Sequence, residues 1–293
     1  MILFFGGGYC TEFLIPLLGK NLDIVSTHSC LPYKAQFLNY NFVRRYELKD
    51  FLKKKKSFFP HISHILISIP PTDNGDRVVN EIYKNRENLK NIKWIGYFST
   101  TGVYGNHNGE WVHEKSGLKT NNKRSKNRIT AENQYLRLFE NNNLPTHIFR
   151  LPGIYGPKRS IFERIIDPNF RFVEKKNQFF SRVHVQDIAR FIYQSMSNPT
   201  PGEIFNLTDD YPCSIDEIIS YACKLLQKDL PPKISLDNKD VSEMTRSFYQ
   251  ENKKVSNSKI KEILGLDFAF PTYKIGLKSI FNKYYNSKKN LLK

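Results

Sequence analysis

Short apolar runs alternate with helix-like stretches through the first half of the chain. The runs have the length and composition of buried strands, and they lie at residues 2–5, 23–27, 64–69, 94–99 and 146–150. The stretches between them have the length of helices, and they end near Gly19 or span residues 76–85 and 127–141. Strands that are apolar on both faces and alternate with helices are typical of a parallel sheet. The pattern predicts an α/β protein with a doubly wound parallel sheet.

A glycine turn joins the first predicted strand to the first predicted helix. Gly6 and Gly8 fit the first two glycines of the GxGxxG fingerprint, which allow a tight turn and a close approach of the backbone to a pyrophosphate. Thr11 replaces the third glycine, and the first helical residues, Tyr9 and Cys10, are expected to bind the cofactor at the positive end of the helix dipole. The sequence predicts a dinucleotide site here, with a purely structural turn as the alternative.

The end of the second predicted strand bears on the choice between NAD and NADP. The fingerprint expects an acidic residue there to bind the ribose hydroxyls, but the chain has His28 and Ser29, while Asp23 lies at the other end. A 2′-phosphate would meet no repulsion, and His28, Ser29 or Lys34 could contact it. NADP is therefore favoured over NAD as the cofactor. Pro70 ends a predicted central strand beside the same site and is expected to shape it.

The alternation of strands and helices changes after Arg150. The elements predicted beyond it are two helices and one strand, at residues 185–197, 214–226 and 204–207, and residues 231–257 are polar and irregular. The expected parts are a dinucleotide-binding Rossmann domain and a smaller C-terminal α/β substrate lobe, which take residues 1–155 (with 183–210 returning to it) and 156–293. Ligands of such proteins bind at the carboxyl edge of the sheet.

Four later sequence blocks strengthen this interpretation. They read FSTTGVYG, RLPGIYGP, RVHVQD and IFNLTD, at residues 98–105, 150–157, 182–187 and 204–209. With the glycine turn, they resemble the extended short-chain dehydrogenase/reductase superfamily, whose NAD-dependent epimerases and dehydratases act on nucleotide sugars. Two further segments are similar to its atypical, YeeZ-like subgroup, at residues 67–76 and 128–132.

The resemblance implies roles for individual residues. Thr100 occupies the position that polarises the substrate oxygen, and Tyr104 lies in the VYG turn near the substrate. Arg150 and Tyr155 are expected to line the substrate pocket. The alternative for Arg150 is an ion pair that holds the two lobes together. Members of this superfamily often pair through helices, so a homodimer is also expected.

The catalytic pair of the superfamily, a tyrosine and a lysine four residues apart, is replaced. Counting back from Glu132 places Arg128 at the lysine position and Arg124 at the tyrosine position. An arginine cannot act as a general acid near neutral pH, because its pKa stays above about 12. Arg128 is still expected to bind a ribose or a phosphate of the cofactor, whereas Arg124 cannot transfer a proton.

Three interpretations of the chemistry follow. Tyr104 takes over as the acid, or His113 or Glu114 supplies acid–base function from a loop, or the usual hydride chemistry has been lost. The leading hypothesis is an NAD(P)-binding, epimerase/reductase-like protein acting on an unknown small substrate, with a nucleotide sugar as a candidate. The alternative is a catalytically silent dinucleotide-binding regulator or scaffold.

The composition and net charge of the chain change the predicted fold and function little. The 293 residues carry a net charge of +17, but the lysines are spread along the chain and most clusters are read as solvated faces. Nucleic-acid binding is the weaker alternative, since no nucleic-acid motif accompanies the charge. The four cysteines form no CxxC pair, and no metal site, disulfide framework or membrane segment is expected. A cytoplasmic location is therefore expected.

Overall fold

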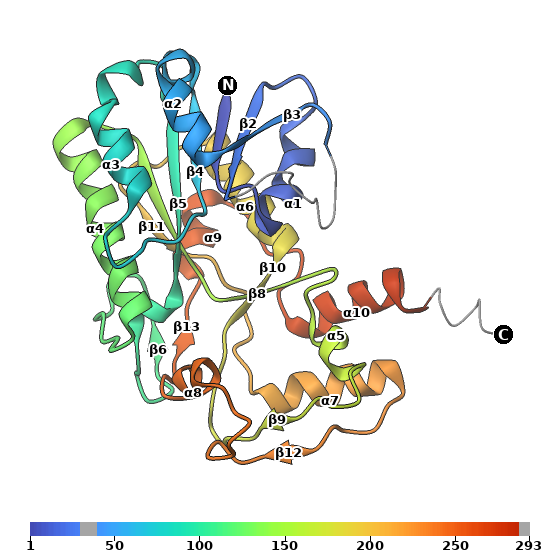
Figure 1. Cartoon of the computed structure of the whole chain (residues 1–293). Helices are drawn as coiled ribbons and strands as arrows, with labels where there is room; N and C mark the ends of the chain where they lie inside the picture. Colours follow the sequence, from blue (N-terminus) through green and yellow to red (C-terminus); the bar gives the residue numbers. More distant parts are fainter. Residues whose placement is uncertain (30–39, 287–293) are drawn as a thin grey trace.

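Seven parallel strands form one sheet at the centre of the molecule (Figure 1). The computed structural model describes residues 1–29 and 40–286. The order across the sheet is β11-β7-β5-β4-β1-β2-β3. These strands are β1 (Ile2–Phe5), β2 (Ile24–His28), β3 (Val43–Glu47), β4 (His64–Ile67), β5 (Trp94–Thr100), β7 (Thr146–Leu151) and β11 (Ile204–Asn206). The strand order reverses between β1 and β4, so the sheet is doubly wound and the predicted Rossmann fold is confirmed.

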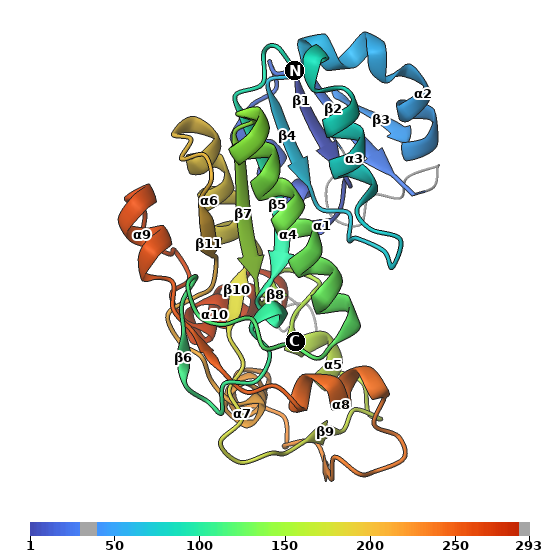
Figure 2. The ribbon, with the colours of Figure 1, turned by 90° about the vertical axis from the view of Figure 1, so that its left-hand side faces the viewer.

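Helices cover both faces of the sheet, because successive residues of a strand point to opposite sides. In β1, Ile2 and Phe4 join one apolar core, while Leu3 and Phe5 join another. The first core is completed by α1 (Tyr9–Leu18), α6 (Val185–Ser197) and α9 (Ser258–Leu264), and the second by α2 (Leu48–Phe58), α3 (Arg77–Lys84) and α4 (Lys123–Asn142). Figure 2 shows α6 and α9 on one side of the strands and α2, α3 and α4 on the other.

Strand β3 and helix α2 are absent from the elements that the sequence predicts. In β3 only Val43 is fully buried, because the strand lies at the edge of the sheet and its VRRYE sequence lacks a continuous apolar run. In α2, Phe51 and Phe58 face the core, and the lysine run at 53–56 occupies the remaining, mostly exposed positions. This run is therefore a solvated helix face.

A smaller lobe lies beyond the carboxyl edge of the sheet (Figure 1). Its helices are α5 (Ile161–Ile165), α7 (Ile215–Leu226), α8 (Glu243–Tyr249) and α10 (Tyr273–Tyr284). Three short parallel pairs complete the fold, formed by β8 (Gly153–Tyr155) with β10 (Arg182–His184), β9 (Phe172–Val173) with β12 (Lys233–Ile234), and β6 (Trp111–Val112) with β13 (Lys254–Val255). Helices α5, α7 and α10 share a separate apolar core. No helix in residues 1–29 and 40–286 is long and apolar enough to cross a membrane.

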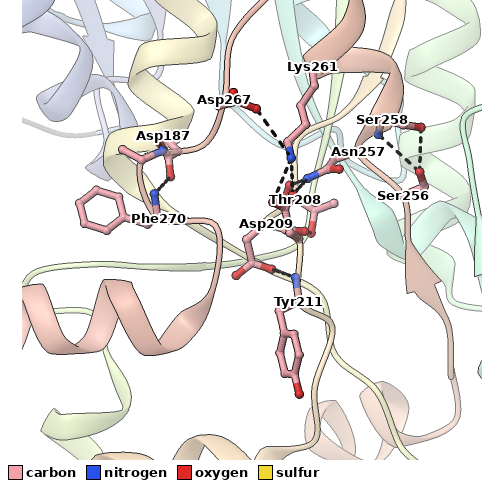
Figure 3. A network of polar contacts seen from close by, with 12 residues as sticks. Asp187, Thr208, Asp209, Tyr211, Ser256, Asn257, Ser258, Lys261, Asp267 and Phe270 are labelled. Atoms are coloured by element: carbon pink, nitrogen blue, oxygen red, sulfur yellow. Dashed lines mark hydrogen bonds and ion pairs between the residues drawn. The ribbon is translucent and has the colours of Figure 1, made fainter.

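Polar contacts join the start of α9 and the segment between α9 and α10 to the sheet domain. Asp187, in the first turn of α6, accepts hydrogen bonds from the N–H groups of Ala269 at 2.8 Å and Phe270 at 2.9 Å (Figure 3). The side-chain amide of Asn257 donates to the carbonyl oxygen of Thr208 at 2.8 Å, just after β11. Helix α9 itself packs in the first core, although its residues fall in the range expected for the C-terminal lobe. These contacts set where α10 enters the lobe.

His147, in the central strand β7, is a buried and neutral imidazole. Its Nδ1–H donates to the carbonyl oxygen of Ile95 at 3.3 Å, and its Nε2 accepts the N–H of Thr200 at 2.9 Å. Burial lowers the pKa of His147 to about 4. Protonation of Nε2 would break the bond from Thr200 and place a charge in the core.

We expect His147 to make the protein sensitive to acid. Between pH 6.5 and 4 the unfolded chain takes up a proton at this residue while the folded chain does not, so the free energy of unfolding falls as the pH is lowered. The contribution is about 1.4 kcal/mol per pH unit, fully retained above pH 6.5. Urea unfolding of wild type and of His147→Gln, whose amide can donate and accept in the same way, measures the difference. Parallel stability curves for the two proteins would contradict the expectation.

Candidate functional site

The glycine turn after β1 is fixed by the two neighbouring strands. The N–H of Gly6 donates to Thr27 Oγ1 at 3.2 Å, and the N–H of Gly7 donates to the carbonyl oxygen of Thr27 at 2.9 Å. The Ser68 hydroxyl, just beyond β4, donates to the carbonyl oxygen of Gly6 at 2.7 Å. Gly6 has a φ of +98°, and a Cβ there would lie 2.4 Å from Ser68 Oγ. Only glycine fits this position without strain.

Gly8 leaves the start of α1 open. It is the N-cap residue of the helix, it is exposed, and as a glycine it brings no side chain to cap the first-turn N–H groups. A Cβ on Gly8 would have no atom within 4 Å. Thr11 turns its hydroxyl back to the carbonyl oxygen of Gly8 at 2.7 Å, while Tyr9 and Cys10 are half-buried. The N–H groups at the positive end of a ten-residue helix attract an anion. The turn therefore fits the pyrophosphate of a dinucleotide.

His28, at the end of β2, is part of the wall of this turn. A Cβ on Gly7 would lie 2.3 Å from His28 Cε1, so the ring packs directly against the glycine backbone. His28 Nε2 lies 3.3 Å from Ser26 Oγ. Burial, together with the positive charge of Arg45 on β3, lowers the pKa of His28 to about 4. The imidazole is therefore neutral at pH 7 and would meet a phosphate as a dipole rather than as a cation.

The other residues predicted around the ribose lie in different environments. Ser29 is exposed after β2, and Pro70 is exposed after the end of β4. Lys34 lies outside the described residues. Glu47 is the register partner of His28 on β3, and its carboxylate forms an ion pair with Lys49 at 2.8 Å. The sequence did not predict that Glu47 or Arg45 would lie beside the end of β2, because β3 itself was not predicted.

Thr100 and Ser125 place two hydroxyls at the carboxyl end of β5. Thr100 Oγ1 accepts the N–H of Gly102 at 3.1 Å, a bond that does not use the hydroxyl proton. A Cβ on Gly102 would lie 2.8 Å from Ser125 Oγ and 3.4 Å from Thr100 Oγ1, so both hydroxyls flank this glycine. Ser125 belongs to α4 because Asn122 caps the helix start, four residues before the predicted one. Ser125 carries no motif that would identify it in the sequence.

Tyr104 is fully buried, and its hydroxyl already has two partners. It donates to Asn206 Oδ1 at 2.7 Å and accepts from Arg150 Nη1 at 2.9 Å. Burial raises the pKa of Tyr104 to about 12. A hydroxyl in this state favours a structural role over the proton transfer that the sequence left open for Tyr104.

Arg150 and Glu132 form a buried ion pair between β7 and α4. Arg150 Nη2 lies 2.8 Å from Glu132 Oε2, and its Nε donates to Glu132 Oε1 at 3.1 Å. Both side chains are at most 3% exposed, and the Ser99 hydroxyl also donates to Glu132. The structure therefore engages Arg150 in a buried ion pair, and Arg150 is not among the residues that line the cavity beside Tyr155. It matches the ion-pair alternative, except that the pair joins two elements of the sheet domain rather than the two lobes.

The arginines at the superfamily's catalytic positions have separate environments. Arg124 is exposed in the first turn of α4. Arg128 reaches β5, where its Nη1 donates to Tyr97 OH at 3.1 Å and to the carbonyl oxygen of Phe98. The guanidinium also lies 5.5 Å from the centre of the Tyr97 ring. Neither residue can exchange a proton near neutral pH.

The loop candidates for acid–base function also have structural partners. His113 is exposed, and its Nδ1 accepts the N–H of Lys115 at 3.3 Å within the same loop. Glu114 accepts the N–H of Asn206 on β11 at 2.8 Å, so its carboxylate closes the edge of the sheet. Both contacts favour the loop-stabilising interpretation of these residues.

A cavity of about 390 Å³ opens in the C-terminal lobe. Tyr155 lines it, and the other lining residues are Ile154, Arg159, Ser160, Ile161, Arg164, Arg182, Ile215, Ile218, Tyr273 and Leu277. The guanidinium of Arg159 lies 5.4 Å from the centre of the Tyr9 ring. The hydroxyl of Tyr9 donates to the carbonyl oxygen of Pro157 at 3.1 Å. Through Tyr9, the cavity therefore borders the first turn of α1.

Other potential sites contribute less. A second cavity of about 390 Å³ is lined by residues of the 165–170 and 227–232 segments and contains none of the predicted site residues. In residues 1–29 and 40–286, no three His, Cys, Asp or Glu side chains are placed to hold a metal ion. Cys10, Cys213 and Cys223 are free thiols, and Cys30 lies outside the described residues.

Comparisons with known proteins place the chain among solved structures. No family model and no curated protein matches the sequence. A functionally unknown conserved protein from Silicibacter pomeroyi is 35% identical, with a TM-score of 0.87 over 96% of this chain and 98% of that one. The dTDP-glucose 4,6-dehydratase of Bacillus anthracis, in complex with NAD, is 16% identical, with a TM-score of 0.76 over 100% and 99%. The UDP-glucose 4-epimerase of Thermotoga maritima, with UDP-glucose, is 16% identical, with a TM-score of 0.75 over 97% and 99%. The two enzymes share the fold with this chain.

Proposed function

The chain belongs to the same family as the conserved Silicibacter pomeroyi protein, and we propose that it is an NAD(P)-binding protein of the epimerase/reductase type. The observation that carries the proposal is the glycine turn before α1, which β2 and β4 hold in place and where the Cβ position of Gly8 opens onto free space at the start of the helix. The proposal includes the YeeZ-like subgroup predicted from residues 67–76 and 128–132. Its substrate is a small molecule, with a nucleotide sugar as one candidate.

In this proposal the glycine turn holds the cofactor. The first-turn N–H groups of α1 bind the pyrophosphate, and Gly6 and Gly8 let the backbone approach it. A bound nicotinamide dinucleotide supplies reversible hydride transfer. NADP is favoured over NAD because β2 ends without a carboxylate, and because the charge of Arg45 is close enough to lower the pKa of His28. The nearest carboxylate on β3, Glu47, is paired with Lys49.

The same proposal gives the substrate two contacts. Thr100 and Ser125 donate hydrogen bonds to a substrate oxygen at the end of β5, and the cavity beside Tyr155 holds the rest of the molecule. Arg124 and Arg128 cannot carry out the proton transfer that the catalytic pair of the superfamily performs. This replacement is the specific observation that favours a second candidate function, a catalytically silent dinucleotide-binding regulator or scaffold.

Turnover by two variants tests the roles of the hydroxyls. NADPH oxidation is followed with a panel of carbonyl compounds and sugar nucleotides. We expect Thr100→Val to lower kcat about 100-fold, because it removes a hydrogen-bond donor to the developing oxyanion, while NADPH affinity stays unchanged. Tyr104→Phe should keep kcat within about twofold and cost about 1–2 kcal/mol of stability, because Arg150 and Asn206 lose a partner.

The opposite pattern is a loss of kcat in Tyr104→Phe with kcat retained in Thr100→Val. It would indicate that Tyr104 is the general acid of the reaction. Cofactor binding without turnover on any member of the panel would favour the silent binder over the enzyme.

A further inference from the structure

Three of the residues that line the cavity beside Tyr155 are arginines, Arg159, Arg164 and Arg182. Arg159 and Arg164 lie against aromatic rings, the latter with its guanidinium 4.5 Å from the centre of Phe170. Arg182 donates to the carbonyl oxygen of Phe180 at 2.9 Å. None of the three arginines forms an ion pair with any part of the chain that the structure describes. Three arginines therefore line one small space, and no carboxylate lines it with them; the buried carboxylate of Asp209, outside the lining, interacts with Arg182.

The nearest acidic residue on α5 is already engaged. One carboxylate oxygen of Glu163 accepts the backbone N–H of Ser160 at 2.7 Å, and the other accepts the hydroxyl of Tyr285 at 2.9 Å. Glu163 is not among the residues that line the cavity. Burial lowers the pKa of Arg164, since a partly desolvated cation without a partner is disfavoured. An incoming oxyanion would relieve this cost and would bind through charge-assisted hydrogen bonds.

Apart from Ser160, the remainder of the lining is mostly apolar. It consists of five aliphatic side chains and two aromatic residues, Ile154, Ile161, Ile215, Ile218, Leu277, Tyr155 and Tyr273. No Asp, Glu, Asn or Gln lines the cavity. The Ser160 hydroxyl already donates to Glu163 at 2.6 Å and accepts the N–H of Phe162 at 3.2 Å. The Tyr155 hydroxyl is buried against Gly276, where an added Cβ would lie 2.1 Å from it.

This lining discriminates against a sugar. Each buried sugar hydroxyl that leaves water without a new partner costs about 1–3 kcal/mol, and the cavity offers few acceptors. An apolar or aromatic body, in contrast, gains free energy by covering the aliphatic wall. The volume of about 390 Å³ suits a compact molecule, near the lower end of ligand pockets.

We propose that this cavity binds an organic oxyanion, a phosphate or carboxylate group carried on a compact apolar or aromatic body. The arginines hold the oxyanion, and the aliphatic wall covers the body. This inference rests on the proposed function and names the substrate class of its second site. It replaces the nucleotide sugar with a molecule that has a charged head but few hydroxyls.

Calorimetric titration without any cofactor tests the assignment. The probes are phenyl phosphate, phenylacetate, benzyl alcohol, inorganic phosphate, glucose 1-phosphate and UDP-glucose. We expect one or both aromatic anions to bind about tenfold or more tightly than glucose 1-phosphate, inorganic phosphate and the uncharged alcohol, a difference of about 1.4 kcal/mol. The preferred aromatic anion identifies the head group. Equal or tighter binding of glucose 1-phosphate or UDP-glucose would overturn the proposal, as would no binding of either aromatic anion.

Arginine variants locate the binding. Arg164→Gln should weaken the preferred anion about tenfold, and Arg159→Gln serves as the second variant if the first does not fold. Arg171→Gln, an exposed arginine of the same lobe outside the cavity, is the matched control and should bind as wild type. Undiminished binding in a folded Arg164→Gln or Arg159→Gln would refute the assignment. NADPH titrated separately distinguishes the two claims, because loss of cofactor binding alone would overturn the proposed function and leave the cavity assignment in place.

Discussion

Gly8→Asp is expected to abolish dinucleotide binding and to leave the fold at least as stable as wild type. Gly8 has φ −113° and ψ −160°, a conformation open to any residue, and its Cβ position is free of contacts. As an N-cap residue, aspartate would accept a first-turn N–H and stabilise α1 by a few tenths of a kcal/mol relative to glycine. The same carboxylate would occupy and repel the pyrophosphate position, so we expect the Kd for NADPH to rise about 100-fold or more. Fluorescence titration and thermal unfolding measure the two effects.

Two further variants separate charge from shape at the turn. Gly8→Asn caps the helix without a charge and should bind NADPH with an affinity between those of wild type and Gly8→Asp. Gly6→Ala should lower stability, because its φ is positive and the new Cβ would press on Ser68. Wild-type NADPH affinity in Gly8→Asp would show that the cofactor does not bind at this turn.

Arg150→Met is expected to produce the largest loss of stability. It leaves the Glu132 carboxylate buried with the Ser99 hydroxyl but without its cation, and it removes the donor to Tyr104. Removing one partner of a buried ion pair costs about 3–5 kcal/mol. Urea unfolding should therefore show a large fall in the midpoint, with secondary structure retained in the folded baseline.

The double variant Arg150→Met with Glu132→Gln is the control. Because the uncompensated charge is gone, it should recover a substantial part of the loss, about 1–3 kcal/mol. A loss below about 1 kcal/mol in Arg150→Met would mean that the buried pair contributes little. That result would reopen the assignment of Arg150 to the substrate pocket.

The central part of the fold could be predicted from the sequence because its signals are local. Strands buried on both faces have continuous apolar runs, and β1, β4, β5 and β7 all carry one. Edge strand β3 does not, because two arginines and a glutamate fit its less buried positions. Because β3 was not predicted, the positions of Arg45 and Glu47 beside β2 were not predicted either. Helices α9 and α10 were not predicted either, although Thr272 caps the start of α10.

The candidate site divides in the same way. Features encoded by neighbouring residues could be predicted from the sequence, whereas contacts between distant residues could not. The glycine turn is encoded by adjacent residues, and the strand before it and the helix after it lie where the sequence predicts them. Whether Arg150 faces a pocket or an ion pair depends on Glu132, eighteen residues away on another element. Ser125 approaches Thr100 only because α4 starts early at the Asn122 cap. Contacts of this kind depend on how helices pack on the sheet, which the periodicity of one sequence does not specify.

The most direct measurement of the central claim is an equilibrium titration of the wild-type protein with NADPH and with NADH, followed by nicotinamide fluorescence. We expect saturable binding of one dinucleotide per chain, with a Kd in the micromolar range (about −8 kcal/mol at 1 μM) and NADPH favoured over NADH. No binding of either dinucleotide at millimolar concentration would contradict the account.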